Sequence, residues 1–260
     1  MTWIAERIPN TKNGGGTYVA APWRFVVHTT EAVPSTVSGA RSMAARHPNP
    51  PHLWAWPEQD WVGQTVPLDR SAFALLHPSG TPHTNKARAL QVEVIGHAAN
   101  SPSKPDWYWE WLGLKVLRPI LDAGYPINLD RVHPTTGNDG YGTAGAVRMQ
   151  WAQWASFDGV CGHSAVPGNS HWDPGAAPLH LIAEAAKGPA MTTTPMPSWV
   201  KPAADAGIVK NATSDWDQPP SKGELAVMLE RAARYAASKV GAGGGPSAEE
   251  VAREIIRQLS

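Results

Sequence analysis

The loop between Cys161 and Gly175 carries the side chains of this chain that are best suited to chemistry. It reads Cys-Gly-His-Ser-Ala-Val-Pro-Gly-Asn-Ser-His-Trp-Asp-Pro-Gly and contains the imidazoles of His163 and His171 and the carboxylate of Asp173. The glycines and prolines between them favour turns over a regular helix or strand. Imidazole and carboxylate groups that converge in a polar loop can hold a borderline-soft cation such as zinc. A surface loop with incidental histidines is the alternative interpretation.

A third imidazole follows a short apolar run near the start of the chain. Phe25, Val26 and Val27 are strand formers, and His28 comes directly after them, before a polar Thr-Thr-Glu segment. The pattern predicts a buried strand with a histidine at its tip, where sheet proteins commonly place functional groups. A purely structural histidine at a strand end is the alternative.

A carboxylate interrupts a second apolar run, which reads Leu-Gln-Val-Glu-Val-Ile at residues 90–95. Alternation along a strand places Glu93 on the face opposite to its two flanking valines. Because an unpaired buried carboxylate is costly, Glu93 either faces solvent on a half-exposed strand or serves a polar site.

Together these three segments resemble the type-2 N-acetylmuramoyl-L-alanine amidases, the zinc amidase and peptidoglycan-recognition superfamily to which many phage endolysins belong. That family combines an early Val-Val-His strand, a middle strand with a glutamate, and a late Gly-His loop that ends in Asp-Pro-Gly. The corresponding segments, all within residues 20–185, read Val26-Val27-His28, Val92-Glu93-Val94, and Gly162-His163 through Asp173-Pro174-Gly175.

The resemblance implies a fold, a cofactor and a set of roles. The fold is α/β, with a central mixed β-sheet flanked by helices. A Zn2+ ion would be held by His28, His163 and Asp173, with a fourth position left for water. Glu93 would be the general base, and His171 falls where the family often carries a lysine that stabilises the tetrahedral oxyanion. Because that lysine is absent, a rival assignment stays open, with His171 as third ligand and Asp173 behind it.

The activity that the resemblance implies is hydrolysis of the amide bond between N-acetylmuramic acid and L-alanine of the peptidoglycan stem peptide, as in an endolysin that lyses bacteria. Two alternatives use the fold without cleavage: a recognition module that binds peptidoglycan, and a virion-associated protein that anchors to the wall. Recognition modules of this superfamily typically lose a zinc ligand, whereas this chain retains all three candidates.

Composition argues against other classes of partner. Lys+Arg and Asp+Glu both number 22 in 260 residues, so no net field draws the chain to nucleic acid or to anionic lipid. No apolar run approaches the ~20 residues that span a bilayer, and we recognise no secretory signal. For a chain that resembles endolysins, this implies synthesis in a host cytoplasm and action on the cell wall after release by another factor of the holin type.

Two further residues of chemical interest are expected to be structural. Cys161 is the only cysteine, so an intrachain disulfide cannot form. Its place two residues before His163 would suit a ligand or a nucleophile, but the family carries a buried apolar residue there, and we predict Cys161 in the core. His52 begins a hairpin predicted around a turn at residues 57–60. A groove-wall role and a structural role are both open to it, and we favour the structural one.

Helices and domain boundaries complete the prediction. Hydrophobic periodicity and caps predict helices at residues 35–46, 107–123, 149–157 and 179–186, which would flank the sheet. The catalytic domain is predicted at residues 1–187. The remaining segments are a Pro/Thr-rich linker at 188–198, a small helical region at 199–240 and a Gly-rich hinge with an amphipathic helix at 241–260.

The predicted C-terminal segments suggest two roles. Residues 199–240 resemble a single S-layer homology repeat, a unit that binds wall polymers, usually in threes. The terminal helix carries its apolar residues on one face but is too short to be stable alone, so we expect it to dock or to self-associate.

Overall fold

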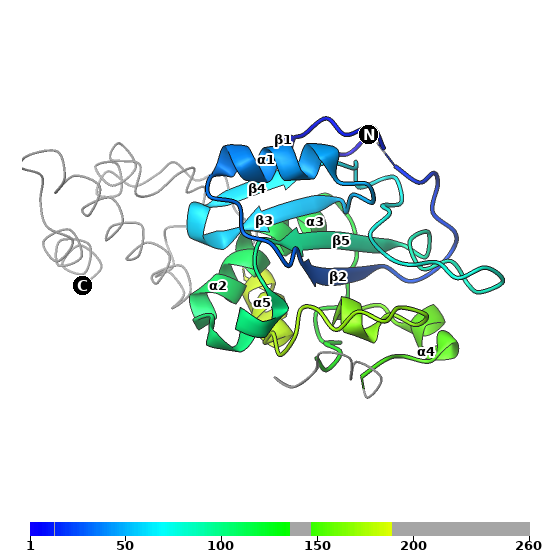
Figure 1. Ribbon diagram of the computed structural model, residues 1–260. Helices are drawn as coiled ribbons and strands as arrows, with labels where there is room; N and C mark the ends of the chain where they lie inside the picture. The colour runs from blue at the N-terminus through cyan, green and yellow to red at the C-terminus, as the bar shows by residue number, and fades with distance from the viewer. Residues whose placement is uncertain (13, 136–146, 189–260) are drawn as a thin grey trace, which may run out of the picture. The chain divides into compact units, whose positions relative to one another are not determined.

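Six strands form one mixed β-sheet in the order β1-β4-β3-β5-β2-β6 (Figure 1). The computed structural model describes residues 1–12, 14–135 and 147–188. The chain divides into two units, Met1–Lys187 and Gly188–Ser260, and beyond Gly188 the predicted linker, helical region, hinge and terminal helix lie outside the described residues. The strands are β1 (Glu6–Arg7), β2 (Arg24–Thr29), β3 (Leu53–Trp56), β4 (Trp61–Gln64), β5 (Ala89–Val94) and β6 (Val160–Gly162).

The middle of the sheet is parallel and buried. Strand β2 lies between β5 and β6 and runs parallel to both, and every residue of β2 and β5 is buried. Strands that helices or loops cover on both faces carry nearly continuous apolar runs, which is the pattern of both segments. The register pairs His28 with Glu93 and Val27 with Gly162, so the carboxyl ends of three strands meet at one edge of the sheet.

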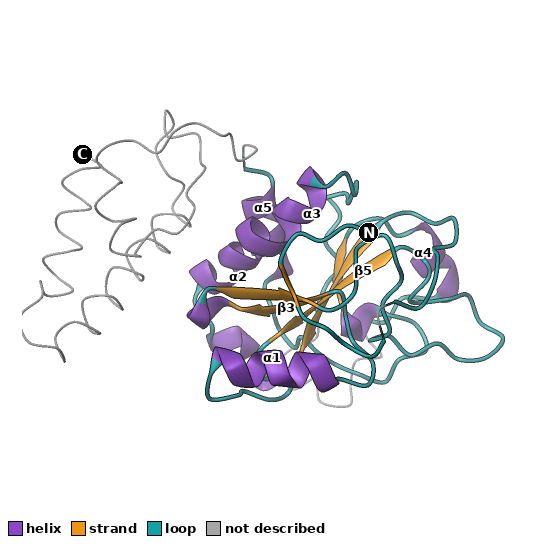
Figure 2. Cartoon of the chain, turned by 90° about the horizontal axis from the view of Figure 1, so that it is seen from above, coloured by secondary structure: helices purple, strands orange, loops and turns teal. Residues whose placement is uncertain are grey.

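Helices cover the two faces of the sheet and confirm the predicted α/β class. Helix α1 lies on one face, and helices α3 and α5 lie on the other (Figure 2). The predicted hairpin is formed by β3 and β4, which pair antiparallel around a 3₁₀ turn at Pro57–Gln59. The helices are α1 (Val37–Arg46), α2 (Asp106–Leu112), α3 (Arg118–Asp122), α4 (Trp151–Ser156) and α5 (Leu179–Ala186).

Helix α1 begins two residues later than periodicity predicts. The Oγ1 of Thr36 accepts a hydrogen bond from the Gly39 N–H at 3.1 Å, which makes Thr36 the N-cap. Ala40 and Ala44 face the sheet, where they belong to a buried cluster that includes Trp54. The two small side chains leave room for the large indole between helix and sheet.

The predicted single helix at residues 107–123 is interrupted. Helices α2 and α3 are joined by a π-helical segment at Gly113–Leu117, at the place where α5 packs against them. A Cβ placed on Gly113 would lie 2.4 Å from the carbonyl oxygen of Ile182 in α5. The absence of a side chain at this position therefore lets the two helix backbones approach closely.

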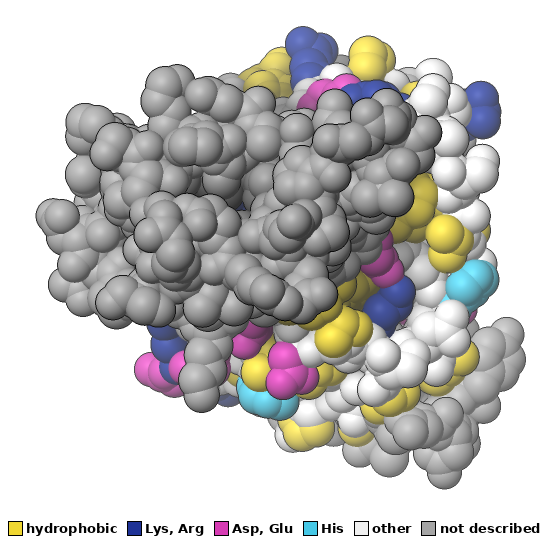
Figure 3. Space-filling view, turned by 90° about the vertical axis from the view of Figure 1, so that its left-hand side faces the viewer, with side chains coloured by type: hydrophobic (Ala, Val, Ile, Leu, Met, Phe, Trp, Pro, Cys, Tyr) yellow, Lys and Arg dark blue, Asp and Glu magenta, His cyan; other side chains and the backbone are white. Residues whose placement is uncertain are grey.

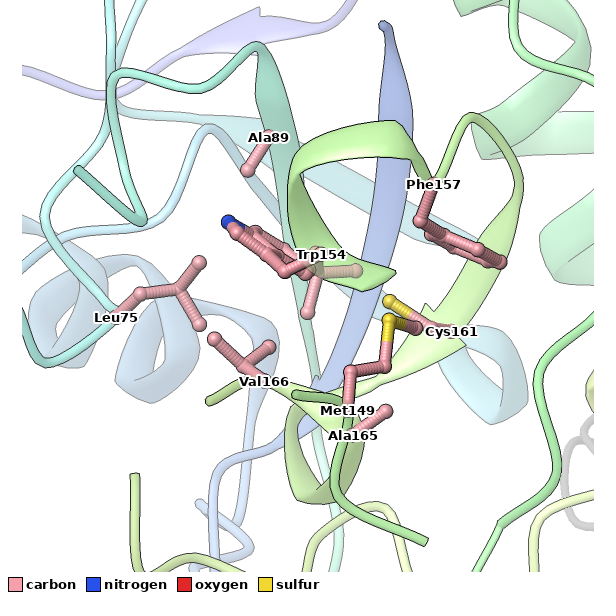
Figure 4. Close-up of a cluster of buried hydrophobic side chains, with 9 residues drawn as sticks. Leu75, Ala89, Met149, Trp154, Phe157, Cys161, Ala165 and Val166 are labelled. Carbon is pink, nitrogen blue, oxygen red and sulfur yellow. The ribbon is translucent and has the colours of Figure 1, made fainter. Parts of the chain in front are cut away.

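Cys161 lies in the core, as predicted. Its side chain is fully buried beside Met149, Trp154 and Phe157 (Figure 4). Helix α4 contributes Trp154, and the other two flank this helix, which is shorter than the predicted 149–157. Burial raises the pKa of the Cys161 thiol to about 12. The thiolate that metal binding or nucleophilic attack requires is therefore scarce at neutral pH.

Charges of both signs lie on the face of the domain that Figure 3 shows. Acidic and basic side chains are interspersed over the coloured part of the face in Figure 3. Among the described residues, no helix combines the length and the apolar character that crossing a membrane requires.

Replacing Gly113 by alanine tests the close approach of α5. Gly→Ala within a helix ordinarily stabilises by about 0.5–1 kcal/mol. Here the new methyl group would overlap backbone, and overpacking of this kind costs about 1–3 kcal/mol. We expect Gly113→Ala to lower the free energy of unfolding, measured by chemical denaturation. Gly39→Ala in α1 is the matched control, because its Cβ would meet only side-chain atoms at 3.1 Å or more. Equal or higher stability in Gly113→Ala would contradict the packing.

Candidate metal centre

Three buried side chains converge at the carboxyl edge of the parallel strands. His28 is the second-last residue of β2, His163 follows β6 directly, and Asp173 comes ten residues later in the loop. One ligand atom from each lies within 4.8 Å of the other two, and each residue is at most 4% exposed. The structure thus brings together all three residues that the sequence suggested as ligands.

The three side chains approach one another through specific nitrogen and oxygen atoms. The Nδ1 atoms of His28 and His163 are 3.0 Å apart. The Asp173 carboxylate spans both rings, with Oδ1 3.2 Å from His163 Nδ1 and Oδ2 3.6 Å from His28 Nδ1. Two imidazole nitrogens and a carboxylate oxygen this close together form a donor set that could hold a metal ion.

The loop fixes Asp173 from both sides. The Ser164 N–H donates to the Asp173 carbonyl oxygen at 2.8 Å, which ties the start of the loop to its end. After Asp173 the chain turns through Gly175, whose φ is +68° and whose Cβ, if present, would lie 2.4 Å from the Ala98 carbonyl oxygen. Only glycine satisfies both conditions, so the turn after the carboxylate has a clear physical cause.

Electrostatics leave Asp173 and His28 in the protonation states that metal binding requires. Burial by itself would raise the pKa of Asp173, but the imidazoles of His163, His171 and His28 outweigh it and hold that pKa well below its usual range. Burial, reinforced by His163, lowers the pKa of His28 well below its usual value. The carboxylate is therefore ionised and the His28 ring neutral at neutral pH, and these are the forms that coordinate cations.

Glu93 lies beside this group and is not at the surface. Its Oε1 is 3.9 Å from His28 Nδ1, the residue is 8% exposed, and Oε2 has no hydrogen-bond partner among the described residues. Burial raises the pKa of Glu93 well above its usual value, and the nearby carboxylates of Asp173 and Glu31 add to the rise. Of the two interpretations open from the sequence, the polar site therefore accounts for this residue.

His171 lies at the solvent edge of the group. Its ring stacks on His163 with centroids 4.5 Å apart, and its Nδ1 is 3.5 Å from Asp173 Oδ1. The side chain is 63% exposed, and its hydrogen bond to Asp173 raises its pKa. The guanidinium of Arg148 donates to the His171 carbonyl oxygen at 2.9 Å and so anchors the backbone at this point.

His52 has the contacts of a structural residue. It is fully buried, its Nδ1 accepts the Gln91 N–H at 3.0 Å, and its Nε2 lies 2.8 Å from both the Tyr18 hydroxyl and the Arg70 carbonyl oxygen. These bonds join the start of the hairpin to β5 and to the loops on either side.

Sequence patterns did not indicate Asn169, which contacts the group most directly. It is 2% exposed, and its Oδ1 lies 2.8 Å from His163 Nε2. An asparagine after Pro-Gly has the sequence signature of an ordinary turn residue, and nothing local indicates that its side chain points inward.

Comparison with known proteins gives structural neighbours only. No family model and no curated protein matches the chain. A mutant of PlyL matches with 15% identity and a TM-score of 0.41, over 71% of this chain and 99% of that one. The Staphylococcus aureus hydrolase AmiA matches with 15% identity and a TM-score of 0.38, over 70% and 81% of the two chains. LysCS, an endolysin N-acetylmuramoyl-L-alanine amidase from Clostridium intestinale URNW, matches with 11% identity and a TM-score of 0.38, over 71% and 97%.

The named amidases and endolysins among these neighbours are of the kind that the sequence motifs resemble. Identities and TM-scores this low identify no activity, so the function of this chain has to follow from its own site.

The raised pKa of Glu93 predicts how the stability of the metal-free protein depends on pH. In the pH range between the unfolded and the folded pKa, the folded state binds the extra proton, so stability falls as pH rises through this window. Glu93→Gln removes this penalty. We expect the metal-free variant to unfold at higher denaturant concentration than the wild type at pH 7, and the difference to shrink towards pH 4. A difference that does not change with pH would contradict the raised pKa of this buried carboxyl group.

Proposed function

We propose that the chain is a zinc-dependent peptidoglycan hydrolase that cleaves the amide between N-acetylmuramic acid and L-alanine, as endolysin amidases do. The observation that carries the proposal is the buried group of His28, His163 and Asp173 with the Glu93 carboxyl group beside it, whose Oε2 has no hydrogen-bond partner among the described residues. Catalytic zinc sites typically use three protein ligands from imidazole and carboxylate groups and leave a fourth position open.

The residues present divide the chemistry between them. Zinc, when bound, would supply Lewis acidity to the scissile carbonyl and lower the pKa of an attacking water. Glu93 would accept the proton from that water and deliver it to the leaving amine. The burial that raises its pKa brings this carboxyl group closer to the working pH, which suits a group that must both take and return a proton.

His171 would stabilise the oxyanion. Its ring stands at the exposed edge of the group, where a substrate carbonyl can reach it, and Asp173 raises its pKa, so a larger fraction carries a proton near neutral pH. A protonated imidazole can replace the lysine that the type-2 amidases, which the motifs resemble, often have at the position of His171. The substrate would be bacterial peptidoglycan, reached after release of the protein to the wall.

Zinc content and activity of two variants separate the ligand from the oxyanion donor. We expect Asp173→Ala to lose zinc and activity. His171→Ala should retain about one zinc per chain and lose about 10²–10³-fold in rate, the usual scale for one oxyanion donor. The measurements are metal analysis of the purified proteins and release of L-alanine amino groups from peptidoglycan.

His28→Ala and His163→Ala serve as reference variants, and both should lose zinc. If His171→Ala empties the site while Asp173→Ala keeps its metal, the two roles are exchanged. Stoichiometric zinc in both reference variants would overturn the site as a whole.

Glu93→Gln separates proton transfer from metal binding. We expect it to retain zinc and to lose about 10²–10⁴-fold in amide hydrolysis, because a general base contributes on this scale. Glu31→Gln is the matched control, because it removes another carboxylate near Glu93. Unlike Glu93 Oε2, the Oε1 of Glu31 already accepts hydrogen bonds, from the Thr29 hydroxyl and the Ala98 N–H. Glu31→Gln should retain hydrolysis within a few-fold. Near-normal turnover in Glu93→Gln would place the base elsewhere.

Binding of peptidoglycan without cleavage by the wild type would identify a recognition module.

A further inference from the structure

The carboxamide of Asn169 is packed against the side of the His163 ring that faces away from the proposed metal. Its Oδ1 lies 2.8 Å from His163 Nε2, whereas His163 Nδ1 faces His28 and Asp173. The asparagine is 2% exposed, so water does not compete freely for this contact.

The other hydrogen bonds of Asn169 fix which end of the carboxamide faces His163. Its Oδ1 also accepts the Leu76 N–H at 2.8 Å, and a backbone N–H can only donate. Its Nδ2 donates to the carbonyl oxygens of Pro167 at 3.1 Å and Leu76 at 3.4 Å, which can only accept. A flipped amide would oppose donor to donor and acceptor to acceptor, so the oxygen must point at His163.

This orientation determines the tautomer of His163. Because Asn169 Oδ1 can only accept, His163 Nε2 must carry the proton. In the neutral ring, Nδ1 then has a free lone pair, and it lies 3.2 Å from the Asp173 carboxylate oxygen. That lone pair and the carboxylate oxygen are close enough for one cation to be bound by both atoms.

We propose that Asn169 is a positioning residue that holds His163 in the Nε2–H tautomer and so prepares Nδ1 for the metal. The proposal rests on the proposed function only in that the site binds zinc. His28 has no equivalent support, because its Nε2 is buried without a hydrogen-bond partner among the described residues. One imidazole of the pair is therefore oriented by a polar partner, and the other by packing in β2.

Asn169 also connects the site to a segment far away in the sequence. Leu76 gives its N–H to Asn169, and its carbonyl oxygen accepts the Thr84 hydroxyl at 2.8 Å. Thr84 thus supports the same segment without contacting His163. This makes Thr84→Val a matched control, since it removes a hydrogen bond from the segment and leaves the Asn169–His163 contact in place.

The first measurement is the tautomer of His163 in the metal-free protein, by long-range ¹H–¹⁵N NMR of the imidazole nitrogens. We expect Nε2–H in the wild type and in Thr84→Val, and a mixture of tautomers in Asn169→Ala. The wild-type spectrum alone can overturn the proposal, because an Nδ1–H tautomer there is incompatible with it even if a variant fails to fold.

The second measurement is the affinity for Zn2+ in competition with a chelator. Loss of a hydrogen-bond partner behind a ligating histidine typically weakens metal binding about 10–100-fold, and we expect this in Asn169→Ala but not in Thr84→Val. Asn169→Asp keeps an acceptor for His163 and should restore the tautomer and most of the affinity, although its buried charge lowers thermal stability.

Three results would count against the inference. Wild-type affinity in Asn169→Ala overturns the role of Asn169 while leaving the zinc site intact. Equal weakening in Thr84→Val shows that Asn169 acts only by holding the segment at Leu76. A wild-type protein that binds no Zn2+ overturns the proposed function and the role of Asn169 with it.

Discussion

Burial of the ionised Asp173 carboxylate is the constraint on which the rest of the site depends. A charge that is 4% exposed is tolerated only when donors or cations surround it. Its neighbours meet this requirement: the Thr29 N–H donates to Oδ2 at 3.3 Å, and imidazoles lie against Oδ1. Each of these groups comes from a different part of the chain, so the loop, the end of β2 and the end of β6 must be in place together.

Parallel pairing supplies that common frame. Because β2 lies between β5 and β6, residues more than sixty positions apart in the sequence leave the sheet side by side. The register sets His28 against Glu93, and the residue after β6 is His163. A shift by one residue would turn one of these side chains to the other face of the sheet. The apolar packing around Val26, Trp154 and Cys161, which fixes the register, is thus a condition for the chemistry at the strand ends.

Local patterns in the sequence predicted β2, β5 and the β3–β4 hairpin and indicated five residues of the candidate site, whereas β1 and β6 were not predicted. The apolar runs that precede His28 and surround Glu93 predicted their strands. The glycines and prolines around His163 and Asp173 predicted the loop, but its first two residues, Cys161 and Gly162, belong to β6, because they pair with β2. Features that exist only between distant segments were not predictable in this way. The π-helical segment at Gly113 depends on the approach of α5. Whether Glu93 was buried could not be decided either, because that depends on the loops that cover the end of its strand.

The buried thiol of Cys161 has a consequence for the chemical durability of the domain. Oxidants and alkylating reagents attack the thiolate, and both its scarcity at a pKa of about 12 and its full burial protect this sulfur. With no second cysteine in the sequence, the chain cannot form or exchange an internal disulfide. The fold therefore contains no internal disulfide that a reducing medium could break or an oxidising medium could form.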